Sequence, residues 1–144
     1  MRPEVRVVRS DRVLQAIQRE IHMFNLQGSK PDIWVALMNV GLAVARDIDI
    51  RWDAHADEGF PDDGFTMILH DVRFIASQSD IQVIVFRLYP DNHKIQAGFL
   101  TMKIEYSDVV GTRYRYHCKL RYAGSGNIPG IAEDSTEVIE SYGD

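Results

Sequence analysis

The stretch FLTMKIEYSDVVGTRYRYHCKLRY, from Phe99 to Tyr122, alternates between two kinds of side chain. The apolar or aromatic row consists of Leu100, Met102, Ile104, Tyr106, Tyr114, Tyr116, Cys118, Leu120 and Tyr122. The polar row consists of Thr101, Lys103, Glu105, Arg113, Arg115, His117, Lys119 and Arg121. A period of two is typical of half-buried strands, because a helix would scatter both rows around its circumference. The stretch therefore predicts a β-hairpin with its turn at Ser107 to Gly111.

Length and composition indicate one soluble globular domain. The chain has 144 residues, of which 45% are hydrophobic and 26% charged, and its net charge is −5. This negative balance opposes general attraction to nucleic acid or anionic membranes. Cys118 is the only cysteine, which excludes an internal disulfide. The charged N-terminus is unlike a signal peptide and no apolar run reaches the ~20 residues of a membrane span, so we expect a cytoplasmic protein.

Further short apolar or alternating segments, separated by turn residues, predict an antiparallel β-sandwich. Besides the hairpin, the expected strands are Pro3–Val8, Asp32–Val40, Arg46–Asp53, Phe65–Phe74 and Ile81–Tyr89. The segment from Ser10 to Phe24 has apolar residues at helical spacing, although its last part also fits a strand. We expect it to form a short helical or irregular cap over one end of the sandwich.

The sequence after Tyr122 changes to glycine, serine and acidic residues. Such a segment has too little apolar surface to offset the entropy of ordering. We therefore expect a domain over residues 1–122 and a flexible acidic tail over residues 123–144.

Two stretches are similar to bacterial and archaeal immunoglobulin-like domains. VALMNVGLAVARDIDI, from Val35 to Ile50, resembles their apolar strand that ends in Asn-x-Gly and is followed by a short alternating strand. IEYSDVVGTRY, from Ile104 to Tyr114, resembles their terminal hairpin, which reads apolar-x-Tyr-x-Asp, two residues, Gly, x, x, Tyr. The resemblance implies an all-β, immunoglobulin-like antiparallel sandwich that serves as an accessory or interaction module, and it carries over no catalytic residue.

The basic row of the hairpin is the most unusual feature of this acidic chain. The expected partner-binding residues are Arg113, Arg115, His117, Lys119, Arg121 and Lys103. They indicate either a contact surface for an acidic partner or a phosphate track, or else a solvated face that protects an edge strand from pairing. Nucleic acid is disfavoured because the expected face lacks outward aromatic side chains. We expect the strand Arg46–Asp53, which carries outward acidic residues, to lie two strands from the basic row. The strand Phe99–Tyr106 is expected between them.

Other candidate residues for a metal or ligand site do not match the spacing of known metal-binding motifs. The acidic loop from Asp53 to Gly64 supplies oxygen ligands for a cation such as Ca²⁺, but it does not match the EF-hand pattern. The alternative metal ligands are Asp53, His55, Asp57 and Glu58. The five histidines lie in separate segments without zinc-ligand spacing. The remaining aromatic candidates, which we expect in the core rather than in a ligand cavity, are Tyr114, Tyr116, Tyr122, Trp34 and Trp52.

The expected function is a non-enzymatic interaction or accessory module that contacts a protein partner through the terminal hairpin and the sheet edge. A homodimer through an edge strand is a variant of this hypothesis. No nucleophile elbow, P-loop or dinucleotide-binding motif is present in the sequence, and we expect no cofactor. The alternative is a small-ligand or metal site at one loop end, formed by Asn39–Val44, Asp53–Gly64 and Ser107–Gly111.

Overall fold

The computed structural model describes residues 2–9, 15, 19, 32–56, 65–68, 74–75, 81–88, 97–123 and 129–141. The elements within these ranges are β1 (Val5–Val7), β2 (Asp32–Asn39), β3 (Ala45–Ala56), β4 (Phe65–Ile68), β5 (Phe74–Ile75), β6 (Ile81–Leu88), β7 (Ala97–Ser107), β8 (Arg113–Ala123) and β9 (Gly130–Glu140). The cap expected over Ser10 to Phe24 lies outside the described residues, apart from Gln15 and Arg19, which are both exposed.

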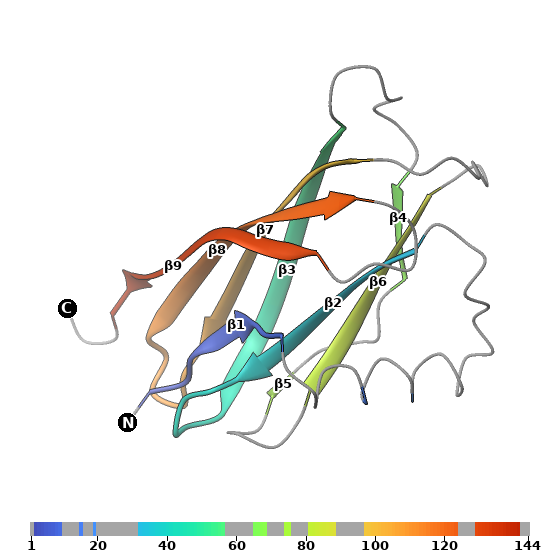
Figure 1. The fold of residues 1–144 in the computed structure, drawn as a ribbon. Helices are drawn as coiled ribbons and strands as arrows, with labels where there is room; N and C mark the ends of the chain where they lie inside the picture. The colour runs from blue at the N-terminus through green and yellow to red at the C-terminus, as the bar shows by residue number, and fades with distance from the viewer. Residues whose placement is uncertain are drawn as a thin grey trace.

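These strands form two sheets that face each other (Figure 1). The first sheet has the order β1-β2-β6-β4, and the second has the order β5-β3-β7-β8-β9. Neighbouring strands are antiparallel in every described pairing. The all-β class with two antiparallel sheets, expected from the sequence, is therefore confirmed.

Strands β7 and β8 form the expected hairpin, whose register pairs Leu100 with Leu120 and Tyr106 with Tyr114. Every member of the predicted apolar row is buried, with exposed fractions of 5% or less. The members of the polar row are half-buried or exposed. The predicted division of the hairpin into a buried apolar row, which we call the dry row, and an outward polar row is confirmed.

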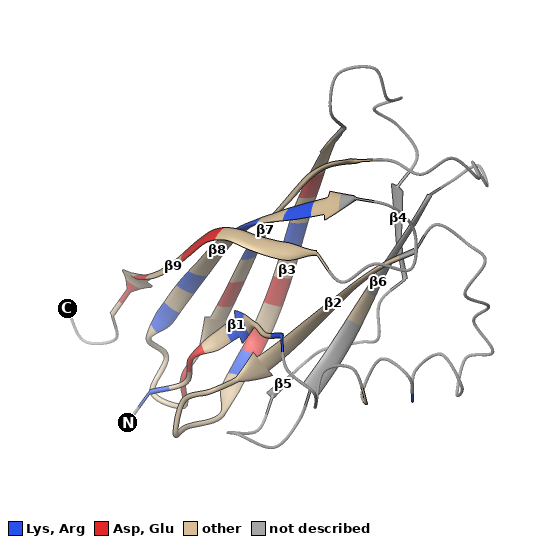
Figure 2. Ribbon diagram, viewed as in Figure 1, with Lys and Arg blue, Asp and Glu red and all other residues tan. Residues whose placement is uncertain are grey.

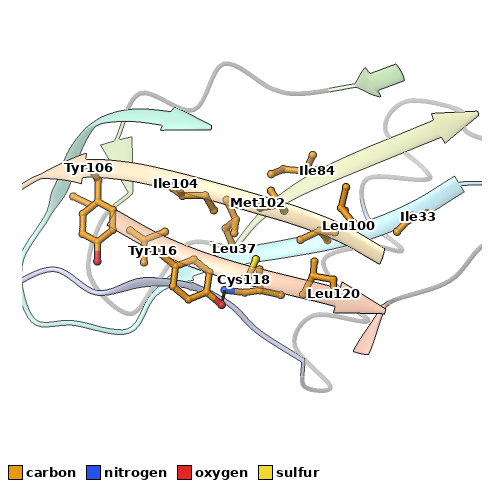
Figure 3. Packing of buried hydrophobic residues seen from close by; sticks show 14 of the residues in the cluster. Ile33, Leu37, Ile84, Leu100, Met102, Ile104, Tyr106, Tyr116, Cys118 and Leu120 are labelled. Carbon is orange, nitrogen blue, oxygen red and sulfur yellow. Dashed lines mark hydrogen bonds between the residues drawn. The ribbon is translucent and has the colours of Figure 1, made fainter. Parts of the chain in front are cut away.

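The dry row of the hairpin forms one core with apolar side chains of the opposite sheet (Figure 3). Leu37 of β2 and Ile84 of β6 are fully buried in this core. Consecutive residues of β2, from Ile33 to Leu37, are all buried, so both faces of this strand are covered. A continuous apolar run is typical of such an interior strand, and the interior position predicted for it is confirmed.

The Asn-x-Gly motif fastens the N-terminal segment to the end of β2. The buried Asn39 accepts hydrogen bonds through Oδ1 from the backbone N–H groups of Glu4 (2.9 Å) and Gly41 (3.0 Å). Its Nδ2 donates to the carbonyl of Ala43 at 2.6 Å. A Cβ atom at Gly41 would lie 2.6 Å from the backbone nitrogen of Glu4 and 2.8 Å from the carbonyl carbon of Pro3. Glycine is required here because the N-terminal backbone occupies the space of a side chain.

The turn between β7 and β8 is organised by Asp108. Its Oδ1 accepts from the backbone N–H groups of Val110 and Thr112, both at 3.0 Å. The hydroxyl of Tyr114 donates to its Oδ2 at 3.1 Å. Gly111 adopts a φ of 97°, in the region that favours glycine. Both motifs quoted from the sequence therefore have local structural roles.

The C-terminal segment differs from the expected flexible tail. Gly130–Glu140 forms β9, which pairs with β8 at the edge of the second sheet. Strand β8 supplies these acidic residues with both a hydrogen-bonding ladder and opposite charges, neither of which the composition of the segment reveals. The expectation of a tail without ordered structure is therefore wrong for β9, while residues 124–128 and 142–144 lie outside the described ones.

Two other segments depart from the expected strands. The single strand expected over Phe65–Phe74 is instead two short strands, β4 and β5, which belong to different sheets. Strand β3 continues to Ala56, beyond the expected end at Asp53. Its register shifts between Arg46 and Asp49, where Asp47 has a φ of 53°. Such a bulge removes Asp47 from the regular alternation of the strand.

Candidate interaction face

The outer face of the second sheet, on β3, β7, β8 and β9, carries the predicted polar row and its neighbours. The register aligns four rows across these strands: Asp49–Glu105–Arg115–Glu137, Arg51–Lys103–His117–Ser135, Asp53–Thr101–Lys119–Glu133 and His55–Phe99–Arg121–Gly130. We call this surface the outer face. As expected, β7 lies between β3 and β8, so the outward residues of β3 are two strands from the basic row.

Strand β8, which carries most of the predicted partner-binding residues, is not an edge strand, because β9 covers it. The interpretation that its charges protect an exposed edge is therefore wrong. The outward basic residues of β8 instead meet acidic residues of β9 (Figure 2). The register places Arg113 opposite Glu140, Arg115 opposite Glu137 and Lys119 opposite Glu133. Opposite charges at directly paired positions stabilise two neighbouring strands.

Arg115 has the densest set of ion pairs on the outer face. Its Nε and one terminal nitrogen donate to Oε1 of Glu105 at 2.9 and 2.7 Å, and its other terminal nitrogen lies 3.4 Å from Glu137. The hydrogen bond from Arg115 holds the pKa of Glu105 below its ordinary value of 4.5. The contact with His117, at 3.2 Å, and that with Arg115 lower the pKa of Glu137. Arg115 therefore links β7, β8 and β9, and its guanidinium is engaged within the chain.

The next row of the outer face is different, because it places basic residues directly opposite each other. Lys103 of β7 lies opposite Arg51 of β3 on one side and opposite His117 of β8 on the other. Arg51 donates to Asp49 at 3.1 Å and His117 contacts Glu137, but among the described residues Lys103 has no ion-pair partner. Like charges at directly paired positions are unfavourable. Lys103 is thus the centre of the uncompensated positive charge on this face.

A shallow open hollow of about 640 Å³ lies over this part of the outer face. The side chains around it come from all four strands: Arg51, Asp53, Thr101, Lys103, His117, Lys119, Glu133 and Ser135. Its floor is formed at Trp52, Met102, Cys118 and Asp134, which are paired in one cross-strand row between the two outward rows. Three of the predicted partner-binding residues, Lys103, His117 and Lys119, are therefore brought together around one depression.

An aromatic side chain lies at the end of the outer face, contrary to the expectation that this face has none. Phe99 is half-buried and belongs to the outward row of β7. Lys119 Nζ lies 4.2 Å from the centroid of its ring, and the guanidinium carbon of Arg121 lies 4.9 Å from it. These cation–π contacts hold Lys119 and Arg121 beside the hollow. The alternation of β7 places Phe99 outward, on the same face as Thr101 and Lys103.

The alternative metal site is only partly described. His55 Nε2 lies 3.0 Å from Asp53 Oδ2, whereas Asp57 and Glu58 are outside the described residues. Within the described ranges, no group of three or more His, Cys, Asp and Glu side chains could hold a metal ion.

The described ends of the three loops proposed for the alternative ligand site lie at two different ends of strand β3. Arg46, at the start of β3, pairs with Ser107, beside two of these loops. The third loop leaves β3 after Ala56, which pairs with Gly98. Ten residues of extended strand place Ala56 about 30 Å from Arg46. The described residues Arg46 and Ala56 therefore lie at opposite ends of β3.

The remaining candidate residues lie in or against the core. Tyr114, Tyr116 and Tyr122 are buried, as expected, and Trp52 is partly buried and packed against the core. Burial raises the pKa of Cys118 to about 12, so its thiol stays protonated near neutral pH.

Tyr116 also makes a link between the two sheets. Its hydroxyl accepts from the backbone N–H of Val7 in β1 at 3.2 Å and donates to Asp134 Oδ2 in β9 at 2.9 Å. The sequence predicted that Tyr116 is buried, but not this contact, because both partners are distant in the chain. A sequence signal for the pairing of β9 with β8 was present, because Glu133 and Glu137 lie at strand spacing on one side of β9.

No protein-family model matches this sequence, and comparisons with curated proteins and with solved structures found no match. In the part of the chain that the structure describes, no helix has the length and apolar character needed to cross a membrane. Support for a function therefore comes from the geometry and charge of the outer face.

Proposed function

We propose that this protein is a non-enzymatic interaction or accessory module of immunoglobulin-like fold. It contacts an acidic protein partner through the β7–β8 hairpin and the adjoining sheet edge. The strand orders β1-β2-β6-β4 and β3-β7-β8 support this fold, because they match the two sheets of an immunoglobulin constant-type domain. Strands β5 and β9 extend the second sheet at its two ends.

The observation that carries the proposed function is the hollow on the outer face, with a basic row at its centre. Of the predicted partner-binding residues, Arg113 and Arg115 are engaged within the chain, by Ser107 and Glu105 respectively. The proposed contact residues that line the hollow are Lys103, His117 and Lys119, and Arg121 lies over Phe99 at the end of the same face. The basic row at the centre of this concave surface favours an acidic group on the partner, because complementary charge speeds encounter and selects among partners.

The sheet edge favours a different partner over a second copy of this chain. Edge strand β9 carries the acidic residues Glu133, Asp134, Glu137 and Glu140 and has no basic residue. Antiparallel pairing of two β9 strands would bring these charges close to each other, which is unfavourable. A homodimer through β9 is therefore the less favoured variant of the proposal.

A charge-reversal variant at the centre of the hollow tests this function. Lys103→Glu combined with Lys119→Gln removes positive charge, and the new glutamate would lie opposite Arg51 and His117, so the fold is expected to remain intact. The matched control is Arg46→Glu, which reverses an exposed charge on β3 away from the hollow.

The assay is affinity capture from the source cells with quantitative mass spectrometry, after thermal denaturation has shown that all variants are folded. We expect one protein to be enriched by the wild type and the control, and at least tenfold less by the hollow variant. Direct binding of that purified protein should show the same order. Equal enrichment by the hollow variant, or no enrichment by the wild type, would refute the proposed function.

A further inference from the structure

The basic row at the centre of the hollow has the layout of a site for one anionic group. Arg51, Lys103 and His117 come from three neighbouring strands at the same level of the sheet. Side chains at directly paired positions start about 5 Å apart at their Cβ atoms, so their charged ends can converge on one group. Lys119 adds a fourth basic group from the adjacent row, held there by its contact with Phe99.

Lys103 and Arg51 retain donors without a partner among the described residues, whereas His117 contacts Glu137 through Nε2 at 3.2 Å. Arg51 contacts Asp49 through Nε, and neither of its terminal nitrogens has a hydrogen-bond partner among the described residues. Ser135 lies at the end of the same row and adds a hydroxyl to the hollow, whereas the hydroxyl of Thr101 donates to the carbonyl of Asp53 at 3.2 Å. Donors from four strands suit a group with three or more oxygens better than a carboxylate, which offers two.

Acidic residues on both sides of the row limit the size of the anion. Asp49, Glu105 and Glu137 lie in the row on one side, and Asp53 and Glu133 lie at the two ends of the row on the other side. A polyanion such as nucleic acid would lay further charges over these carboxylates and be repelled. This arrangement of charges favours a single compact anion over a polyanion.

We propose that Lys103, with Arg51, His117 and Lys119, binds the phosphoryl group of a phosphorylated side chain on the protein partner. This inference rests on the proposed function, since it specifies which chemical group the acidic partner presents in the hollow. The phosphoryl group supplies a double negative charge and three terminal oxygens. These match the cluster of basic donors, and the rest of the partner lies along the open hollow.

The first test is a titration of the ¹⁵N-labelled protein with a phosphoserine peptide, at constant ionic strength, followed by NMR. We expect saturable shifts centred on Lys103 and His117, and an affinity about tenfold or more lower for Lys103→Gln, since one charge-assisted hydrogen bond is lost. Arg46→Gln, the matched control, should change the affinity less than twofold. The inference would be overturned if Lys103→Gln bound the phosphoserine peptide as tightly as the wild type. It would also be overturned if the wild type bound the same peptide equally tightly with aspartate in place of phosphoserine.

The second test separates this inference from the proposed function. The captured partner is treated with phosphatase before its binding is measured again. Loss of binding supports the phosphoryl site, and inorganic phosphate should then compete with the untreated partner. Undiminished binding after complete dephosphorylation would overturn the phosphoryl site while the interaction module stands.

Discussion

Replacement of Tyr116 by phenylalanine tests the hydrogen-bonded link between the two sheets. The hydroxyl of Tyr116 is the only atom removed, and it joins the N–H of Val7 to the carboxylate of Asp134. Tyr116 is 1% exposed and Val7 is 4% exposed, so water cannot readily replace the lost acceptor at the N–H group. Asp134 is exposed and can be rehydrated, so most of the cost arises at Val7.

The expected magnitude follows from this asymmetry. A buried N–H group that loses its partner costs about 1–3 kcal/mol, and the aromatic ring stays in place, so Tyr116→Phe should lower the free energy of unfolding by about 2 kcal/mol. In a domain of this size, the melting temperature should fall by roughly 8 °C. Urea denaturation measures the free energy, and the hydrogen exchange of the Val7 amide should become faster than that of other β1 amides.

Tyr106→Phe is the matched control, because it removes the same atom from a tyrosine that is equally buried. Among the described residues, the hydroxyl of Tyr106 has no hydrogen-bond partner. Its removal should therefore change the stability by less than about 0.5 kcal/mol. If Tyr116→Phe has no larger effect than this control, the hydroxyl does not hold the two sheets together and the reasoning is refuted.

Two further perturbations address the turn of β2 and the ion pairs of the outer face. Gly41→Ala should lower the free energy of unfolding by about 2 kcal/mol, because the new methyl group meets the backbone of Pro3 and Glu4; a loss below about 0.5 kcal/mol in urea denaturation would contradict the close approach. The lowered pKa of Glu105 predicts a contribution to stability that is present above its ordinary pKa of 4.5 and is lost as the pH falls through the folded-state pKa. Thermal denaturation between about pH 6 and pH 3 should therefore show a shallower decline for Glu105→Gln than for the wild type, and identical slopes would contradict the ion pair with Arg115.

The sequence by itself determined those features that depend on neighbouring residues. Alternation at a period of two separated the buried row of β7 and β8 from the outward row, because successive side chains of a strand point to opposite faces. The turns at Asn39 and Asp108 were likewise readable, because short polar side chains and glycine satisfy turn backbone within a few residues. Most of the predicted partner-binding residues could be identified in this way as one outward row.

Only the tertiary structure decided that β9 lies beside β8 at the edge of the second sheet. The composition of residues 123–144 predicts a flexible tail, whereas the acidic residues of β9 gain contacts with β8 that composition does not reveal. Glu105 of β7 and Glu137 of β9 engage Arg115, while Lys103 lies at the centre of the hollow. Strand pairing brings together residues that are far apart in the sequence. The free energy of a charged side chain therefore depends on which charges the pairing places opposite to it. The basic row was therefore visible in the sequence, but which of its charges remain available for a partner was set by the fold.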